Sequence, residues 1–324
     1  MGTPARPGPQ DSEPGSAARR YPPPMPLGLL TGLGAALAWG TLDVFSALAS
    51  RRVGSLKVTT GIQLVGATLV IALALATGTS FPADPAVIIG GSLVGLAGAG
   101  AYLSYFTGLR IGPIAVVSGM VAAYGGLTVV LAVLFRGETL TLLQAAGATL
   151  ATIGVILTGV AFDGSLRGTR LASPGVAFAI VALVLFATMS IGSDIVIDRA
   201  TWIELLLVSR TANAVLSTII LVLAMTVGRR IAQPLLIGDE GGERRADRRV
   251  VGFIALAGLL DVAGLIVFTY GLEFAETWLV GLASSFGPAV TIIFAVAFLG
   301  ERLKPVQWLG LAGVLAGMIA IGLP

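Results

Sequence analysis

The chain has 324 residues, of which 56% are hydrophobic and only 11% are charged, and its formal net charge is +3. An average soluble domain carries roughly 25% charged residues, so this composition excludes an ordinary water-soluble fold. The sequence contains neither Cys nor His, which excludes disulfides, thiolate or imidazole metal sites and the usual catalytic bases. It has no phosphate-loop motif of the kind an ATP-driven pump needs.

Residues 1–26 are rich in Pro, Gly and charged side chains. A segment of this composition buries too little apolar surface to order itself, so we expect a disordered tail. A cleaved signal peptide is the alternative, because Arg19 and Arg20 precede an apolar run that ends in Ala47, Leu48 and Ala49. That run is longer than a signal core of about 7–15 residues, which favours a retained first span.

Apolar runs follow the tail, each close to the roughly 20 residues that cross a bilayer as a helix. They are continuous rather than alternating, which favours helices over barrel strands and predicts an all-α membrane protein with ten transmembrane helices. The predicted spans are Leu27–Ala49, Val58–Thr77, Ala86–Leu109, Ile114–Phe135, Leu140–Phe162, Pro174–Asp194, Trp202–Val227, Val250–Leu272, Thr277–Leu299 and Pro305–Leu323.

An internal repeat divides these spans into two five-helix halves, 27–162 and 174–324, with a linker at 163–173. Leu134–Gly159 aligns without a gap with Ala297–Gly322, at an offset of 301 − 138 = 163 residues. Because five is an odd number, the second half enters the membrane in the opposite orientation. Inverted repeats of this kind are typical of secondary transporters, whose substrate site lies near the bilayer midplane.

A charged loop at 228–249 interrupts the second half. It contains both arginines and acidic residues, a mixture typical of a solvated loop and not of a nucleic-acid site.

The halves share a Gly-Glu pair after the fourth and ninth spans, and the run PAVTIIFAVAFLGERL precedes the second of these pairs. Together with Trp39-Gly40 in the first span, these residues resemble the drug/metabolite transporter superfamily and, within it, the ten-helix EamA-type proteins. The resemblance implies a multi-pass transporter of the plasma or inner membrane, which exports a small metabolite, amino acid or drug-like solute by alternating access. It implies neither enzymatic activity nor a cofactor, and leaves the oligomeric state open. The first half departs from the second in having Gly125 where Pro288 stands, and the sixth span lacks a Trp-Gly pair.

Two other functions remain open: a membrane scaffold or sensor with the same fold, and an intramembrane enzyme. The second lacks support, because Asp261 is not part of a Gly-x-Gly-Asp motif.

Ionisable residues within the spans are the first candidates for a site, since a charge at the bilayer centre costs at least about 2.5 kcal/mol. They are Asp43, Asp261 and Arg210, with Gln63 at the position that matches Arg210 in the first half. In one interpretation Arg210 pairs with Asp261, Asp43 or Glu204 to hold the bundle together. In the other, a carboxylate binds a proton or a cationic substrate, with Asp261 the first candidate and Asp43 the second.

Aromatic and small polar residues complete the predicted pocket, because they can stack on a planar or cationic solute and line one narrow helix face. These candidates are Trp39, Tyr102, Tyr105, Tyr124, Tyr270, Ser284, Ser285 and Pro288.

The repeated pairs, Gly137-Glu138 and Gly300-Glu301, have a structural interpretation. A carboxylate near a helix N-terminus is stabilised by the helix dipole and the free N–H groups there, so we expect the two glutamates to cap helices five and ten.

Orientation is left open by the sequence. Most arginines and lysines in the loops lie on the face opposite the termini, so the positive-inside rule places both termini outside. The family resemblance places them in the cytoplasm.

The inverted repeat predicts that single cysteines at positions 138 and 301 are labelled from opposite faces of the membrane. The measurement is labelling with a membrane-impermeant maleimide in a protein of uniform orientation. Labelling of both positions from the same side would contradict the inverted repeat.

Overall fold

The structure, a computed structural model, describes residues 25–111, 117, 120–159, 174–226, 236, 248–287, 289–290 and 305–322. The first half contains α1 (Met25–Val53), α2 (Ser55–Thr77), α3 (Pro85–Ile111), α5 (Tyr124–Leu131), the π-helical η1 (Ala132–Arg136) and α6 (Leu142–Gly159). The second half contains α7 (Pro174–Ile197), α8 (Trp202–Thr226), α10 (Arg248–Phe274), α11 (Thr277–Ser284) and α13 (Pro305–Gly322).

Six described helices, α1, α2, α3, α7, α8 and α10, are long and apolar enough to cross a membrane. Shorter apolar helices lie at Met120–Arg136, Leu142–Gly154 and Trp308–Ile321. The prediction of an all-α membrane fold built from two repeats is confirmed. The beginning of the fourth predicted span and most of the second part of the ninth lie outside the described residues.

Several helices extend beyond the predicted apolar runs. Helix α1 continues to Val53 and includes Arg51 and Arg52 in its last turn, and α3 ends with Arg110 close to its terminus. Basic side chains at a helix C-terminus are stabilised by the dipole, so the backbone remains helical after the apolar run has ended. Helix α10 likewise begins at Arg248, so the last two residues of the predicted charged loop belong to a helix.

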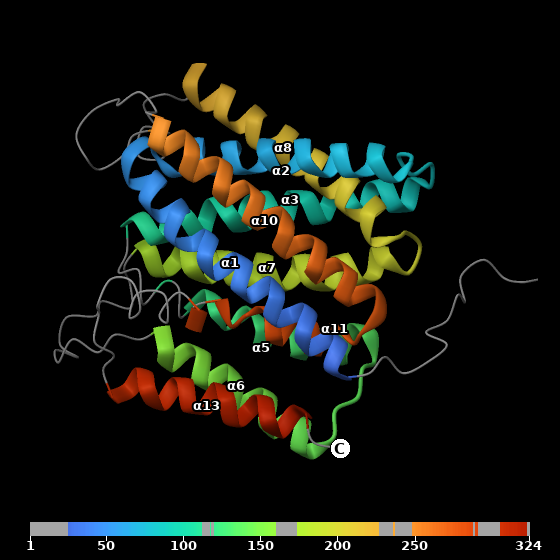
Figure 1. Cartoon of the computed structure of the whole chain (residues 1–324), viewed down its shortest axis with the longest axis vertical. Coiled ribbons are helices and arrows are strands. Elements are labelled where there is room, and N and C mark those ends of the chain that lie inside the picture. The colour runs from blue at the N-terminus through green and yellow to red at the C-terminus, as the bar shows by residue number, and fades with distance from the viewer. Residues whose placement is uncertain are drawn as a thin grey trace, which may run out of the picture.

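The packing follows the repeat (Figure 1). Helix α1 of the first half lies along α10 of the second, and α7 of the second lies along α3 of the first. Helices α2 and α8, which occupy the same position in the two halves, contact each other, and so do α5 and α11. Each contact between the halves therefore has a counterpart with the halves exchanged, as expected about a pseudo-twofold axis.

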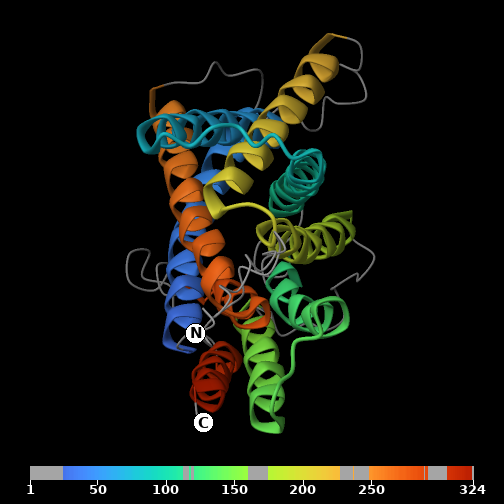
Figure 2. The ribbon, with the colours of Figure 1, turned by 90° about the vertical axis from the view of Figure 1, so that its right-hand side faces the viewer.

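Helices α6 and α13 form a pair at one end of the molecule (Figures 1 and 2). Their glycines allow the close approach: a Cβ on Gly154 would lie 2.6 Å from the backbone nitrogen of Val314, and one on Gly317 would lie 2.7 Å from that of Ala151. Small residues at helix contacts are the usual means of packing in lipid.

The fourth and ninth helices are both interrupted near their middle. The turn at Ala123 precedes α5, and the turn at Ser285 and Phe286 ends α11. Ala123 and Phe286 are equivalent positions, since 286 − 123 = 163. The interruption in the first half thus needs no proline; Pro288 itself lies outside the described residues. Gly125 allows α5 to approach α11, because a Cβ there would lie 2.6 Å from the Cβ of Ser285.

Gly137 ends η1 with φ 64° and ψ 22°, in the left-handed region. No atom lies within 4 Å of a Cβ placed on Gly137, so a larger side chain would fit there. The left-handed backbone conformation is therefore what favours glycine at this position.

Gly137→Ala should therefore lower the free energy of unfolding by about 1–2 kcal/mol, the cost of a left-handed L residue. Gly252→Ala is the matched control, because Gly252 is helical and also has open space around it. Alanine there should be neutral or stabilising by up to about 1 kcal/mol. Thermal unfolding in detergent compares the two, and equal effects would contradict the conformational explanation.

Candidate functional site

A buried ion pair lies at the centre of the bundle. The Arg210 Nη2 on α8 is 2.5 Å from the Asp261 Oδ2 on α10, and the two side chains are 3% and 0% exposed. Tyr102 on α3 donates its hydroxyl to the Asp261 Oδ1 at 2.6 Å, and Arg210 donates from Nη1 to the Oε1 of Gln63 on α2. The guanidinium also lies 6.0 Å from the centroid of the Tyr102 ring.

This central network lies on the axis between the halves. Helices α2 and α8 begin at Ser55 and Trp202, an offset of 202 − 55 = 147, and Gln63 and Arg210 have the same offset, 210 − 63 = 147. Two equivalent residues that contact each other must lie at the axis that relates them. Because the ion pair belongs to the second half and its neutral partners Gln63 and Tyr102 to the first, the network joins the two repeats.

A cavity lies beside this network. Its volume is about 60 Å³, which is room for several waters at about 10–15 Å³ each. The lining residues are Trp39, Leu42, Asp43, Tyr102, Tyr105, Val121, Ala122, Tyr124, Phe186, Met189, Ser190, Ser284, Ser285 and Gly287. A second, smaller cavity of about 20 Å³ shares Tyr102 and Met189 with it and reaches Arg210.

The walls of the larger cavity are built in equivalent pairs. At an offset of 147 the pairs are Trp39 and Phe186, Leu42 and Met189, and Asp43 and Ser190; at 163 they are Val121 and Ser284, Ala122 and Ser285, and Tyr124 and Gly287. The offset increases from 147 to 163 residues because the second half has a longer connection between α8 and α10 than the first half has between α2 and α3. The cavity therefore straddles the repeat axis, with Tyr102 and Tyr105 as its remaining, unpaired contributors.

Asp43 supplies the only carboxylate among the described lining residues, and no Arg or Lys is among them. Its Oδ2 accepts a hydrogen bond from the Tyr105 hydroxyl at 2.8 Å. Across the cavity the hydroxyls of Tyr124 and Ser284 lie 2.8 Å apart. The site thus combines one acidic group with five aromatic rings and several hydroxyls.

The predicted site residues divide into three groups in the structure. Trp39, Asp43, Tyr102, Tyr105, Tyr124, Ser284 and Ser285 line the larger cavity, whereas Gln63, Arg210 and Asp261 form the central network behind Tyr102. Tyr270 lies elsewhere: it is 41% exposed and packs on Trp202 and Phe274.

Phe186, Met189 and Ser190 on α7 also line the cavity, and the sequence analysis did not select them. The offset of 147 residues between Gln63 and Arg210, applied to the first and sixth spans, would have found them as the equivalents of Trp39, Leu42 and Asp43. Within the described residues no group of three His, Cys, Asp or Glu side chains is placed to hold a metal ion.

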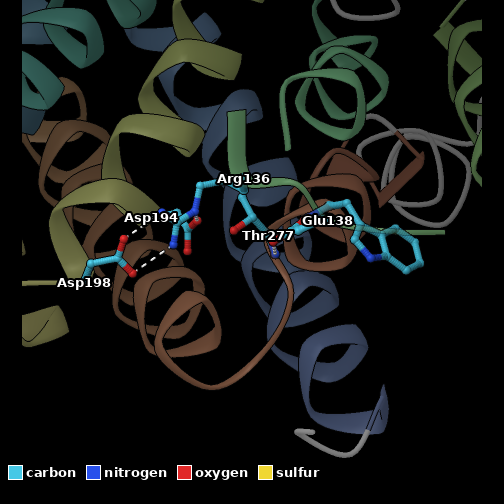
Figure 3. Close-up of polar contacts among 6 residues, drawn as sticks. Arg136, Glu138, Asp194, Asp198 and Thr277 are labelled. Atoms are coloured by element: carbon cyan, nitrogen blue, oxygen red, sulfur yellow. Dashed lines mark hydrogen bonds and ion pairs between the residues drawn. The ribbon is translucent and has the colours of Figure 1, made fainter. Parts of the chain in front are cut away.

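Glu138 binds a helix of the other repeat and not the one that follows it. Its Oε1 and Oε2 accept hydrogen bonds from the backbone N–H groups of Thr277 and Trp278, at 3.0 and 3.1 Å, in the first turn of α11 (Figure 3). The expected cap on helix five is made instead by Thr141 and Gln144, whose side chains each accept from the other's backbone N–H. Gly300 and Glu301 lie outside the described residues.

Comparison with known proteins agrees with this architecture. The model of the EamA-like transporter family matches residues 26–160 and 173–323. The chain belongs to the EamA-like transporter family. The drug/metabolite transporter superfamily, suggested by the repeated Gly-Glu pairs, is confirmed, and with it a membrane transporter.

A solved crystal structure aligns with a TM-score of 0.72 at 20% identity, covering 90% of this chain and 95% of its own, and shows the same fold. An uncharacterised protein of Methanocaldococcus jannaschii is 27% identical over 77 residues, which are 24% of this chain. The match spans about half, 56%, of that relative's length.

The ion pair predicts a strong coupling between Arg210 and Asp261. Asp261→Asn or Arg210→Gln alone leaves a buried charge unpaired and should lower the free energy of unfolding by about 3–5 kcal/mol. The double variant leaves no unpaired charge, so its loss should be well below the sum of the two single losses. Thermal unfolding of the four proteins in detergent measures this, and additive losses would contradict the pairing.

Proposed function

We propose that this protein is a secondary transporter of a small organic cation with an apolar or aromatic body, bound in the cavity between the repeats. The observation that carries the proposal is that six equivalent pairs of residues line the cavity. A site on the axis of an inverted repeat is reached equally by either half, which is the geometry that alternating access requires.

The chemistry of the walls favours a positive charge on the solute. Asp43 is an acidic group, and the faces of Trp39, Tyr105 and the other rings attract cations through their quadrupoles. An anionic solute would find no basic partner on the described walls, because Arg210 is bound to Asp261 behind Tyr102. A zwitterionic amino acid is disfavoured for the same reason, since its carboxylate would be unpaired.

Asp43 is also the better candidate for proton loading. Asp261 was the first expectation, but its charge is stabilised by Arg210 at 2.5 Å and by the Tyr102 hydroxyl. Among the described residues, Asp43 accepts a side-chain hydrogen bond from the neutral Tyr105 hydroxyl, and it lines the cavity. A carboxylate that holds either a proton or the solute, but not both, would exchange one for the other across the cell membrane. Export is the direction that the family resemblance predicts.

The test compares two ligands of the same shape, benzyltrimethylammonium and its neutral carbon analogue neopentylbenzene. The cation should bind the purified protein more tightly than the neutral analogue does. Asp43→Asn should weaken binding of the cation by about tenfold or more, which is at least about 1.4 kcal/mol, and should leave binding of the neutral analogue nearly unchanged.

Ser46→Ala is the control on the same helix, because the Ser46 hydroxyl bonds to the carbonyl of Asp43 and does not line the cavity. Binding is measured by equilibrium dialysis against protein-free micelles. If a folded Asp43→Asn protein lost affinity for both ligands equally, or for neither, the proposal that Asp43 binds the cation would be refuted.

A further inference from the structure

Arg136, which was not among the predicted site residues, fastens the end of η1 to the end of α7 (Figure 3). Its Nε lies 2.5 Å from the Oδ2 of Asp194, and its Nη1 and Nη2 lie 2.6 and 2.8 Å from the two carboxylate oxygens of Asp198. The planar guanidinium suits this arrangement, since its five donors form a rigid fork. We call Arg136, Asp194 and Asp198 the clamp.

The clamp lies directly beyond the cavity on two of its walls. On α7, Ser190 lines the cavity and Asp194 lies one turn further along the same face. On the fourth helix, Tyr124 lines the cavity and Arg136 ends the same continuous helix. The Asp194 side chain is 1% exposed, so the contact is buried within the bundle and shielded from solvent.

The residues next to the clamp close a third wall. Gly137 turns the chain so that Glu138 points to α11 while Arg136 points to α7 (Figure 3). Glu138 holds the start of α11, where Thr277 and Trp278 are 0% and 1% exposed. Residues 136–138 therefore join three cavity walls at one face of the membrane, the face at which η1 and α7 end.

The positions that match the clamp in the repeat carry different residues. The positions that match its three residues are Leu299 (136 + 163), Ala47 (194 − 147) and Arg51 (198 − 147). Two of these are apolar and the third has the opposite charge to Asp198, so they cannot form ion pairs with one another. The sequence thus repeats the Gly-Glu pair in both halves but does not repeat the residues of the clamp.

We infer that Arg136 is a gate residue, which holds the cavity closed at the clamp face and so stabilises the access state that is closed there. Opening at this face requires η1 to part from α7 and therefore breaks three charged contacts. An equilibrium between two states shifts by the difference in interactions that each state retains. The clamp thus shifts this equilibrium toward the state that is closed at the clamp face.

The experiment uses the absence of cysteine from the chain. A single cysteine at Ser190, on the α7 wall of the cavity, reports access from either face to a membrane-impermeant methanethiosulfonate in sealed vesicles of known orientation. Arg136→Gln should increase the labelling rate from the clamp face by about tenfold, a shift of about 1.4 kcal/mol, and lower the rate from the other face.

Arg136→Gln leaves Asp194 buried without its cation and can reduce the folded yield. The double variant Arg136→Gln, Asp194→Asn removes both charges and should fold while giving the same change in sidedness. Asp198→Asn, at a half-exposed position, should give a smaller change in the same direction. Arg199→Gln is the control, because Arg199 is an exposed arginine at the same end of α7 and is not part of the clamp.

Simple loosening of the bundle would raise labelling from both faces, so the ratio of the two rates distinguishes a gate from a structural contact. An unchanged ratio in the folded double variant would overturn the inference. The inference rests on the proposed alternating access of the cavity, but the assay contains no solute, so its result does not depend on whether Asp43 selects cations.

Discussion

The ion pair between Arg210 and Asp261 is the interaction on which the arrangement of the two halves depends. A lipid-embedded bundle gains little from the hydrophobic effect between its helices, so packing and polar contacts must fix how the repeats meet. Arg210 meets its equivalent, Gln63, on the axis, while Tyr102 reaches Asp261 from the first half. Four helices, α2, α3, α8 and α10, are joined at this point. Removing either charge would leave the other one buried and unpaired.

Around this centre the halves are symmetric in backbone and unequal in chemistry. The cavity is bounded by matched positions, yet Asp43 is matched by Ser190 and Tyr124 by Gly287. The same holds for the clamp, whose three charged residues are matched in the repeat by Leu299, Ala47 and Arg51. In the proposed mechanism, symmetry of the backbone makes two access states possible, and the side chains determine which is more stable and what solute the cavity accepts.

The helices could be predicted from the sequence because a bilayer forces every spanning segment to satisfy its own backbone hydrogen bonds. The repeat was also visible, since it leaves Gly-Glu pairs at a fixed offset. Contacts between helices were less accessible, because rotation of one helix about its axis changes the partners without changing the pattern. Glu138 therefore binds α11 and not its own helix, and Arg136 finds Asp194 and Asp198, 58 and 62 residues away (194 − 136 and 198 − 136). The pairing of Arg210 with Asp261 was one of three alternatives that charge alone left open.

The central claim is that the faces of this bundle open alternately about a fixed axial network. Paired spin labels on two matched pairs of positions test it most directly: Thr139 with Arg199 at the clamp face, and their equivalents Arg302 (139 + 163) with Arg52 (199 − 147) at the other. Electron–electron distance measurements in lipid should show two populations at each pair. When conditions shift the equilibrium between the two access states, the longer distance should become more populated at one face as the shorter distance becomes more populated at the other. A single unchanging distance at both pairs would contradict the account.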